Sequence, residues 1–157
     1  MSGRVIARIL IVWGLFGLAL ALVLAFAGSD ENGQAADGDV VTVRVGGVPV
    51  EAEVAATDGS RTRGLAGHRR LAPGEGMLFV FGGAGGHDFW MQGVDFPLDM
   101  IWIRGDRVSG VTQRAPPEAQ SGRRLFPSPG PIDRVLEVPG GWASRESVRA
   151  GDAYSGP

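Results

Sequence analysis

The stretch VVTVRVGGVPVEAEV, residues 40–54, reads as two β-strands joined by a tight turn. Valines recur at alternating or near-continuous positions on both sides of Gly46 and Gly47, and two glycines between β-prone runs are typical of a two-residue hairpin turn. Side chains that alternate with a period of two share one face of a strand. The stretch therefore predicts an antiparallel hairpin at the start of a β-based domain.

The rest of the chain repeats this pattern of short apolar runs between glycines and prolines. Further strands are expected over residues 76–81, 88–92, 99–104, 107–113, 132–138 and 150–154. One short helix is expected within residues 57–70, where Thr57 can cap the N-terminus, and another over residues 142–148. Many short strands at regular spacing predict a mainly β fold, a compact small barrel or sandwich of antiparallel strands with one or two short helices.

Two segments between these strands are expected to be loops. Residues 82–86 are GGAGG and lack the following helix and the Lys-Ser/Thr pair of a phosphate-binding loop, so they indicate a flexible hairpin loop. Residues 115–131 contain five prolines, which have no N–H group to donate to a sheet. This second segment is expected to run over the surface in extended form.

The N-terminal segment predicts membrane targeting. Residues 9–27 contain no charged side chain and follow Arg4 and Arg8. A helix that rises about 1.5 Å per residue would nearly cross a bilayer core of about 30 Å over this length, while the small-x-small sequence at 25–27 also fits a cleavage site. Residues 1–27 are therefore expected to form an apolar helix that serves either as a cleaved signal peptide or as a transmembrane anchor.

Residues 28–39 are small and polar, which predicts a flexible linker before a folded domain at residues 40–157. Because both arginines precede the apolar run, the positive-inside rule places this domain outside the cytoplasm. It is expected to be membrane-anchored on the outer side of the cytoplasmic membrane, or periplasmic or secreted if the leader is cleaved. The membrane is thus an expected partner through the N-terminal segment.

Charge and composition exclude several classes of function. The chain has 15 basic and 17 acidic residues, and without Arg4 and Arg8 the exported part has a net charge of −4. An acidic domain of this kind is not expected to bind nucleic acid. The absence of cysteine excludes disulfides, thiol nucleophiles and thiolate metal sites. No cofactor and no metal are expected.

Several short motifs occur in a fixed order over residues 42–154. They are RGL at 63–65, LAPGEGMLF at 71–79, FWM at 89–91, PLD at 97–99, PSPGP at 127–131 and VLEVPGGW at 135–142. In their order and spacing they resemble the DUF192 family of small exported or membrane-tethered proteins of unknown function. The resemblance implies a compact, mainly β domain with little helix, and it implies no established activity, cofactor or catalytic residue.

The chain departs from the pattern of that family in one triplet and at one further residue. A Lys-Asn-Thr triplet often follows the Trp-Met pair, and this chain has residues 92–94 (QGV) there. The methionine that usually follows the Gly-Leu pair is replaced by Ala66. If the polar triplet contributes to a site in the family, that site is altered in this chain.

Asp99 does not fit the alternation of its strand. It shares a face with Ile101 and Ile103, which are expected to be buried, and burial of an unpaired carboxylate costs several kcal/mol. The favoured interpretation is that Asp99 accepts backbone N–H bonds at a strand start. The alternative pairs it with Glu137 or Asp95 as the acid and base of an envelope polysaccharide hydrolase.

Other side chains near this strand can be considered as binding groups. Arg63 follows a polar helix and could hold a carboxylate or phosphate, or pair internally with Asp99 or Glu137. Trp90, Trp102 and Trp142 could each form a platform for a sugar ring or peptide segment or fill a core, and core filling is the commoner use of tryptophan. A soft metal site from His87 and Met91 has too few ligands.

The candidate binding residues are therefore Arg63, Trp90, Asp99 and Glu137, with no catalytic residue assigned. They predict a non-catalytic binding or accessory module for a small polar ligand, a glycan or a protein partner at the cell envelope. The alternatives are the hydrolase with paired carboxylates and a purely structural domain.

Overall fold

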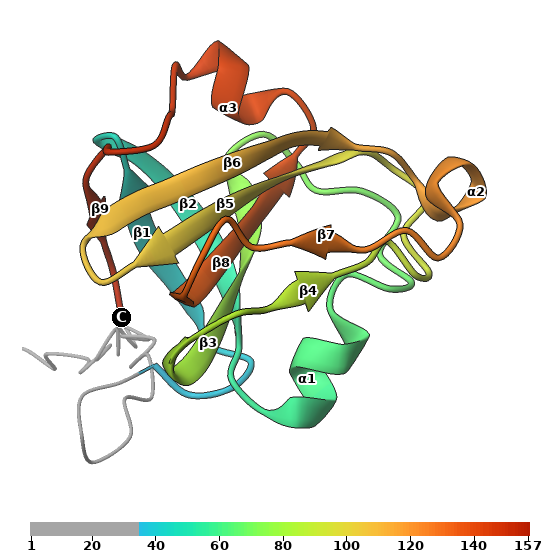
Figure 1. The fold of residues 1–157 in the computed structure, drawn as a ribbon, viewed down its shortest axis with the longest axis horizontal. Coiled ribbons are helices and arrows are strands. Elements are labelled where there is room, and N and C mark those ends of the chain that lie inside the picture. Colours follow the sequence, from blue (N-terminus) through green and yellow to red (C-terminus); the bar gives the residue numbers. More distant parts are fainter. Residues whose placement is uncertain (1–34) are drawn as a thin grey trace, which may run out of the picture.

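The computed structural model describes residues 35–157, and the predicted signal peptide or anchor lies outside the described residues. In chain order the elements are β1 (Val40–Val45), β2 (Val48–Ala55), α1 (Asp58–Arg63), β3 (Glu75–Gly85), β4 (Asp88–Phe89), β5 (Leu98–Arg104), β6 (Arg107–Ala115), α2 (Glu118–Ser121), β7 (Phe126–Pro127), β8 (Ile132–Pro139), α3 (Trp142–Arg145) and β9 (Tyr154–Ser155). Seven strands form one sheet in the order β6-β5-β8-β3-β2-β1-β9, which curls into a half-barrel (Figure 1). Strands β4 and β7 form a separate two-stranded ribbon across its outer side. The predicted mainly β fold is confirmed.

The opening hairpin forms as the sequence predicts. Strands β1 and β2 are antiparallel, and Val45 pairs with Val48 across the two-residue turn. Gly46 and Gly47 have φ angles of 58° and 85°, the left-handed values that this type of hairpin turn requires.

Two features of the predicted architecture are wrong. The domain has three short helices, because α2 lies within the proline-rich segment that was expected to be a loop. Strands β2 and β3 are parallel and not antiparallel, because α1 lies between them and returns the chain to the end of the sheet at which β2 began.

The two predicted loops are also more ordered than expected. Strand β3 continues through Gly85, which pairs with Ile132 of β8, so residues 82–86 are not a hairpin loop. Strand β4 pairs with β7 instead, through Phe89 opposite Phe126. The proline-rich segment thus supplies one strand of the outer ribbon.

The segment before β1 is tied to the domain from residue 35. The Asp37 carboxylate accepts hydrogen bonds from the N–H groups of Ala56 and Thr57, at 2.7 and 3.2 Å, and from the Ser60 hydroxyl. Hydrogen bonds from the Ser60 side chain, and then from the backbone of Ala56, lower the pKa of Asp37 to about 2. The part of the predicted linker that the structure describes therefore packs at the start of α1. Within residues 35–157 no helix has the length and apolar character to cross a membrane.

The C-terminal segment joins the two edges of the sheet at one end of the half-barrel. Tyr154 of β9 pairs with Val45 of β1. Its N–H also donates to the carbonyl of Asp106, at 2.8 Å, and Ala153 forms a bridge with Arg107 at the start of β6. Strands β1 and β6 are thus held together although they stand far apart in the sheet order (Figure 1).

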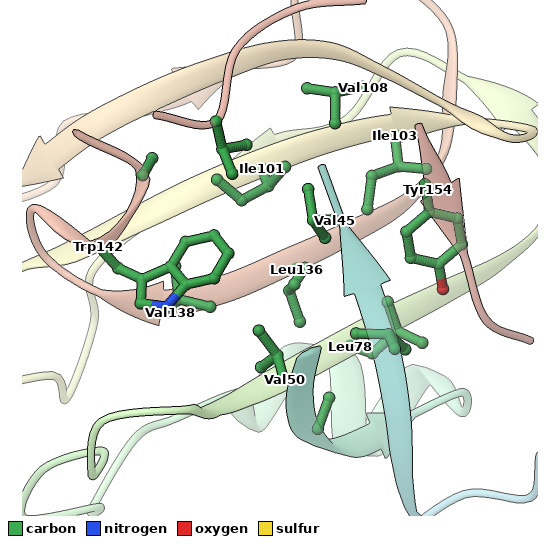
Figure 2. Packing of buried hydrophobic residues seen from close by; sticks show 14 of the residues in the cluster. Val45, Val50, Leu78, Ile101, Ile103, Val108, Leu136, Val138, Trp142 and Tyr154 are labelled. Atoms are coloured by element: carbon green, nitrogen blue, oxygen red, sulfur yellow. The ribbon is translucent and has the colours of Figure 1, made fainter. Parts of the chain in front are cut away.

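Two hydrophobic clusters lie on the two faces of this sheet. The concave cluster fills the inside of the curl and includes valine, leucine and isoleucine side chains from both ends of the sheet, closed by Trp142 of α3 (Figure 2). Met77 and Phe79 alternate with Leu78 along β3 and belong to the second cluster. This convex cluster is covered by the residues that follow α1 and by the outer ribbon, and the candidate site lies there.

Candidate functional site

A pocket of about 200 Å³ lies on the convex side, between α1, the residues around β4 and the sheet. Aromatic side chains form one wall of this pocket, and it is called here the aromatic pocket. The aromatic lining comes from Phe79, Phe81, His87, Phe89 and Trp90. Glu137 reaches it from the sheet, and residues 61–65 of the α1 region form another side.

The aromatic wall is a set of rings that fix one another. Phe89 lies edge-to-face against Phe79 with ring centroids 4.9 Å apart, and against Trp102 with centroids 5.4 Å apart. Phe81 stacks on His87 at 3.7 Å. Edge-to-face pairs of this kind are favoured by the ring quadrupoles. The pocket is therefore preformed by packing and does not depend on a ligand to shape its wall.

Glu137 is the buried polar group of this pocket. It lies on β8 directly between Met77 of β3 and Met100 of β5, and its residue is 3% exposed. None of the residues 35–157 forms a hydrogen bond with its side chain. Burial raises the pKa of Glu137 to about 8, so at neutral pH its carboxyl group keeps its proton and can donate a hydrogen bond.

His87 is a second polar group of the pocket without a partner. Its side chain is half-buried, and its Nε2 atom has no hydrogen bond within the described part of the chain. Burial and then the nearby charge of Arg61 lower the pKa of His87, which favours the neutral imidazole. A neutral imidazole nitrogen can donate or accept according to its tautomer.

The two arginines of α1 differ in how they are held. Thr57 caps the N-terminus of α1. Arg61, in the last turn of α1, donates hydrogen bonds to the carbonyls of Ala56 and Val80 and forms an ion pair with Asp58. Arg63 is exposed and has no ion pair or hydrogen bond to any residue that the structure describes. The guanidinium of Arg63 is thus available at the pocket for an anionic group.

The end of α1 fits closely over the aromatic wall. Gly64 ends the helix with a φ angle of 47°, and a Cβ atom at this position would lie 3.3 Å from the ring of Phe79. Glycine therefore allows both the left-handed turn and the close approach. This contact places Arg63 next to the aromatic lining.

Trp90 is the exposed aromatic of the site. Its residue is 46% exposed, whereas Trp102 and Trp142 are 1% and 3% exposed and fill the two cores. The expected alternation from His87 to residue 92 is confirmed, because residues 87 and 89 are half-buried, Met91 is buried, and residues 88, 90 and 92 are exposed. Trp90 thus presents part of its ring to solvent at the pocket wall.

Asp99 does not belong to this pocket. It is fully buried at the concave face, where its Oδ1 atom accepts from the N–H groups of Arg114 and Gly141, at 2.7 and 2.8 Å. Its Oδ2 atom accepts from Ala143 N–H at 2.8 Å. The interpretation of Asp99 as an acceptor of backbone N–H bonds is confirmed, although the donors come from distant segments and not from its own turn.

The buried position of Asp99 corrects the predicted site and argues against the hydrolase alternative. Asp99 and Glu137 project from opposite faces of the sheet, so they cannot flank one scissile bond. Asp95 is exposed and does not line the aromatic pocket. No carboxylate pair of the kind predicted therefore forms a cleft.

Three of the four predicted residues, Arg63, Trp90 and Glu137, line the same pocket. Sequence reasoning missed the phenylalanines of the wall and gave His87 no role. The available signal was the alternation of Phe79 and Phe81 along their strand, but their place beside Glu137 depends on the pairing of β3 with β8. Within residues 35–157 no three His, Asp or Glu side chains gather as a metal site would require.

Comparison with known proteins agrees with this architecture. The family model DUF192, described as "Uncharacterized ACR", matches residues 41–156. A crystal structure of a protein of unknown function from Novosphingobium aromaticivorans DSM 12444 is similar, with 30% sequence identity, a TM-score of 0.71, and coverage of 81% of this chain and 89% of that one. A protein from Sinorhizobium meliloti 1021 that is labelled a "putative transcription regulator" is similar with 29% identity and a TM-score of 0.67, over 73% of this chain and 92% of that one. Among curated proteins none matches. Since the family model spans nearly all of the described residues, the chain belongs to the DUF192 family.

Proposed function

We propose that this domain is a non-catalytic ligand-binding module and that the aromatic pocket is its binding site. The observation that supports this most is Glu137, a residue only 3% exposed, which lines the pocket and whose carboxyl group has no hydrogen-bond partner among the described residues. Buried polar groups in proteins are almost always hydrogen-bonded, and an unpaired one costs about 1–3 kcal/mol. A ligand that accepts a hydrogen bond from Glu137 would offset this cost.

The lining indicates the chemistry of the ligand. The aromatic wall suits a ring with an apolar face, and the volume of about 200 Å³ suits a single ring, because it lies below the usual range of about 300–1,000 Å³ for drug-sized ligands. The free guanidinium of Arg63 suits a carboxylate, which it can bind bidentately. A ring that carries a carboxylate and a hydrogen-bond acceptor therefore fits the pocket best.

The proposed place of action is the cell envelope. The apolar run of residues 9–27 after Arg4 and Arg8 supports export of the domain. The Sinorhizobium meliloti protein is described as a transcription regulator, which suggests nucleic-acid binding for that protein. The excess of acidic residues in this chain argues against such a role here.

Isothermal titration of the purified full chain tests the proposal. The probes are galacturonate and benzoate, which carry a carboxylate on one ring, with glucose as a neutral ring. We expect one of the two acids to bind, the Glu137→Leu variant to lose binding, and Arg63→Gln to weaken it by about tenfold or more.

Arg145→Gln is the matched control for Arg63→Gln. Arg145 is also an exposed arginine in the last turn of a short helix, and it lies outside the pocket. Its replacement should leave the affinity unchanged. If neither acid binds, or if binding survives both pocket substitutions, the aromatic pocket is not the site.

A further inference from the structure

A second pocket of about 430 Å³ adjoins the aromatic pocket, and is called here the outer pocket. It is lined by Trp90, Gln92, Glu118, Gly122, Arg123 and Leu125. Trp90 and Gln92 line both pockets. The two pockets therefore share one wall, and the half-exposed ring of Trp90 stands between them.

Two hydrogen bonds of Glu118 hold the segments that line the outer pocket. The Glu118 carboxylate accepts from the N–H of Gly93 at 2.9 Å, and the Glu118 N–H donates to the carbonyl of Val94 at 3.0 Å. These two bonds hold the start of α2 against the chain that follows Trp90. The lining residues of the outer pocket are thus fixed relative to the aromatic pocket.

Exposed apolar surface gathers at this pocket. Within residues 35–157 the exposed large hydrophobic residues are Val40, Trp90 and Leu125, and the last two, at 46% and 49% exposure, both line the outer pocket. Polar side chains with planar ends, Gln92 and Glu118, stand beside them. An aromatic platform flanked by planar polar groups suits a sugar ring, which has apolar faces and a rim of hydroxyl groups.

Arg123 supplies an available positive charge in the outer pocket. It forms no ion pair or hydrogen bond with the residues that the structure describes, whereas its neighbour Arg124 stacks over the ring of Phe126 at 4.9 Å. Arg63 has the same unpaired state in the aromatic pocket. An otherwise acidic domain thus presents one unpaired guanidinium in each of two adjoining pockets.

We propose that the two pockets together form an extended site for an acidic oligosaccharide, with one carboxylate-bearing ring in each pocket, Arg63 and Arg123 as the carboxylate partners, and Trp90 stacked on the chain between them. The inference rests on the proposed function, because it takes the aromatic pocket as the first subsite. It adds the second subsite and the polymeric nature of the ligand.

Titration of the full chain with trigalacturonate, galacturonate and neutral cellotriose tests this inference. Trigalacturonate is expected to bind about tenfold or more tightly than galacturonate, because the second carboxylate reaches Arg123. The Arg123→Gln variant should lose this gain and keep the affinity for galacturonate. Cellotriose should bind at least about tenfold more weakly than trigalacturonate, and added salt should reduce the difference.

The outcomes separate this inference from the proposed function. Equal affinities for galacturonate and trigalacturonate, equal binding of cellotriose, or a gain that survives Arg123→Gln would each overturn the extended site. Complete failure of trigalacturonate to bind would overturn it as well, while binding of benzoate or galacturonate that depends on Glu137 would still sustain the aromatic pocket. Arg145→Gln serves again as the control, and a melting curve of each variant checks that it is folded.

Discussion

Asp99 and Glu137 lie on neighbouring strands of one sheet. The carboxylate of Asp99 accepts several hydrogen bonds from the protein, whereas the carboxyl group of Glu137 forms none with the described residues. Asp99 faces Val138 across β5 and β8, and Glu137 faces Met100 one position further along. Asp99 accepts three backbone N–H bonds on the concave side, whereas Glu137 has no partner among residues 35–157 on the convex side. The same two strands thus carry one carboxyl group that stabilises the fold and one that reduces its stability when charged.

Replacement of Glu137 by glutamine should remove a loss of stability at high pH. An unfolded glutamate releases its proton above a pKa of 4.5, while folded Glu137 keeps it up to about 8. The contribution of Glu137 to stability is therefore full below pH 4.5 and falls by up to about 1.4 kcal/mol per pH unit until pH 8. Glu137→Gln has no such decline and should be more stable at pH 8 by a few kcal/mol. Urea unfolding at pH 5, 7 and 9 measures this, and parallel profiles for the two proteins would contradict it.

Replacement of Asp99 by asparagine should destabilise the fold. The amide group of asparagine would place N–H groups against one of the three backbone donors and leave that donor unpaired. Loss of a buried, charge-assisted hydrogen bond with an unpaired donor costs about 2–4 kcal/mol. Asp95→Asn, at an exposed position, should change the free energy of unfolding by less than about 0.5 kcal/mol. Similar values for both variants in chemical denaturation would be inconsistent with the role of Asp99.

Replacement of Asp37 by asparagine should lower stability except in strong acid. Because the pKa of Asp37 falls from 3.8 to about 2 in the folded state, its contribution is present above pH 3.8 and disappears as the pH falls through 2. Asp37→Asn should therefore melt at a lower temperature than the wild type at pH 5, and the difference should shrink below pH 3. The comparison with Asp95→Asn separates this local effect from the change in net charge. A difference that stays constant down to pH 2 would count against it.

Replacement of Trp90 by alanine should reduce binding far more than stability. Its ring is half-exposed, whereas Trp102 is buried in the convex cluster and lies edge-to-face against Phe89, so Trp102→Ala should cost about 3–5 kcal/mol and Trp90→Ala much less. Trp90→Ala should nevertheless weaken galacturonate binding, because it removes the wall shared by the two pockets. Melting curves and titrations of both variants measure the two effects. A loss of stability in Trp90→Ala equal to that of Trp102→Ala would favour a purely structural role.

Local patterns in the sequence predicted the tight turn and the burial of side chains along single strands, because both depend on residues close together in the chain. The hairpin at Gly46 and Gly47 follows from turn chemistry, and the burial of Ile101 and Ile103 follows from alternation along one strand. The parallel pairing of β2 with β3 depends on how α1 crosses over the sheet, although a helix between two strands was a usable signal for it. The pairing of β4 with β7 brings together residues separated by a proline-rich segment, and no local pattern indicates that contact.

The same distinction applies to the site. Arg63 was a candidate because an arginine at the end of a polar helix can hold an anion, Trp90 because tryptophan can be a platform for a ring, and Glu137 because it could pair with Asp99. Their convergence depends on strand order, which alternation does not reveal. Asp99 was equally anomalous in its strand, but its partners Gly141 and Ala143 are more than 40 positions away in the sequence. A polar residue on a buried strand face therefore indicates a role in folding or in binding, and only the tertiary structure shows which of the two it is.

The way in which residues 151–155 join β1 to β6 has a consequence for biosynthesis and quality control. Until these residues leave the ribosome, both outer strands present unpaired N–H and C=O groups, which are templates for association with other chains. A chain cut before Gly151 would keep those templates open however well the rest of the sheet had formed. Nascent and truncated copies should therefore be the species that chaperones and proteases engage, while the half-barrel with its two edges joined escapes them.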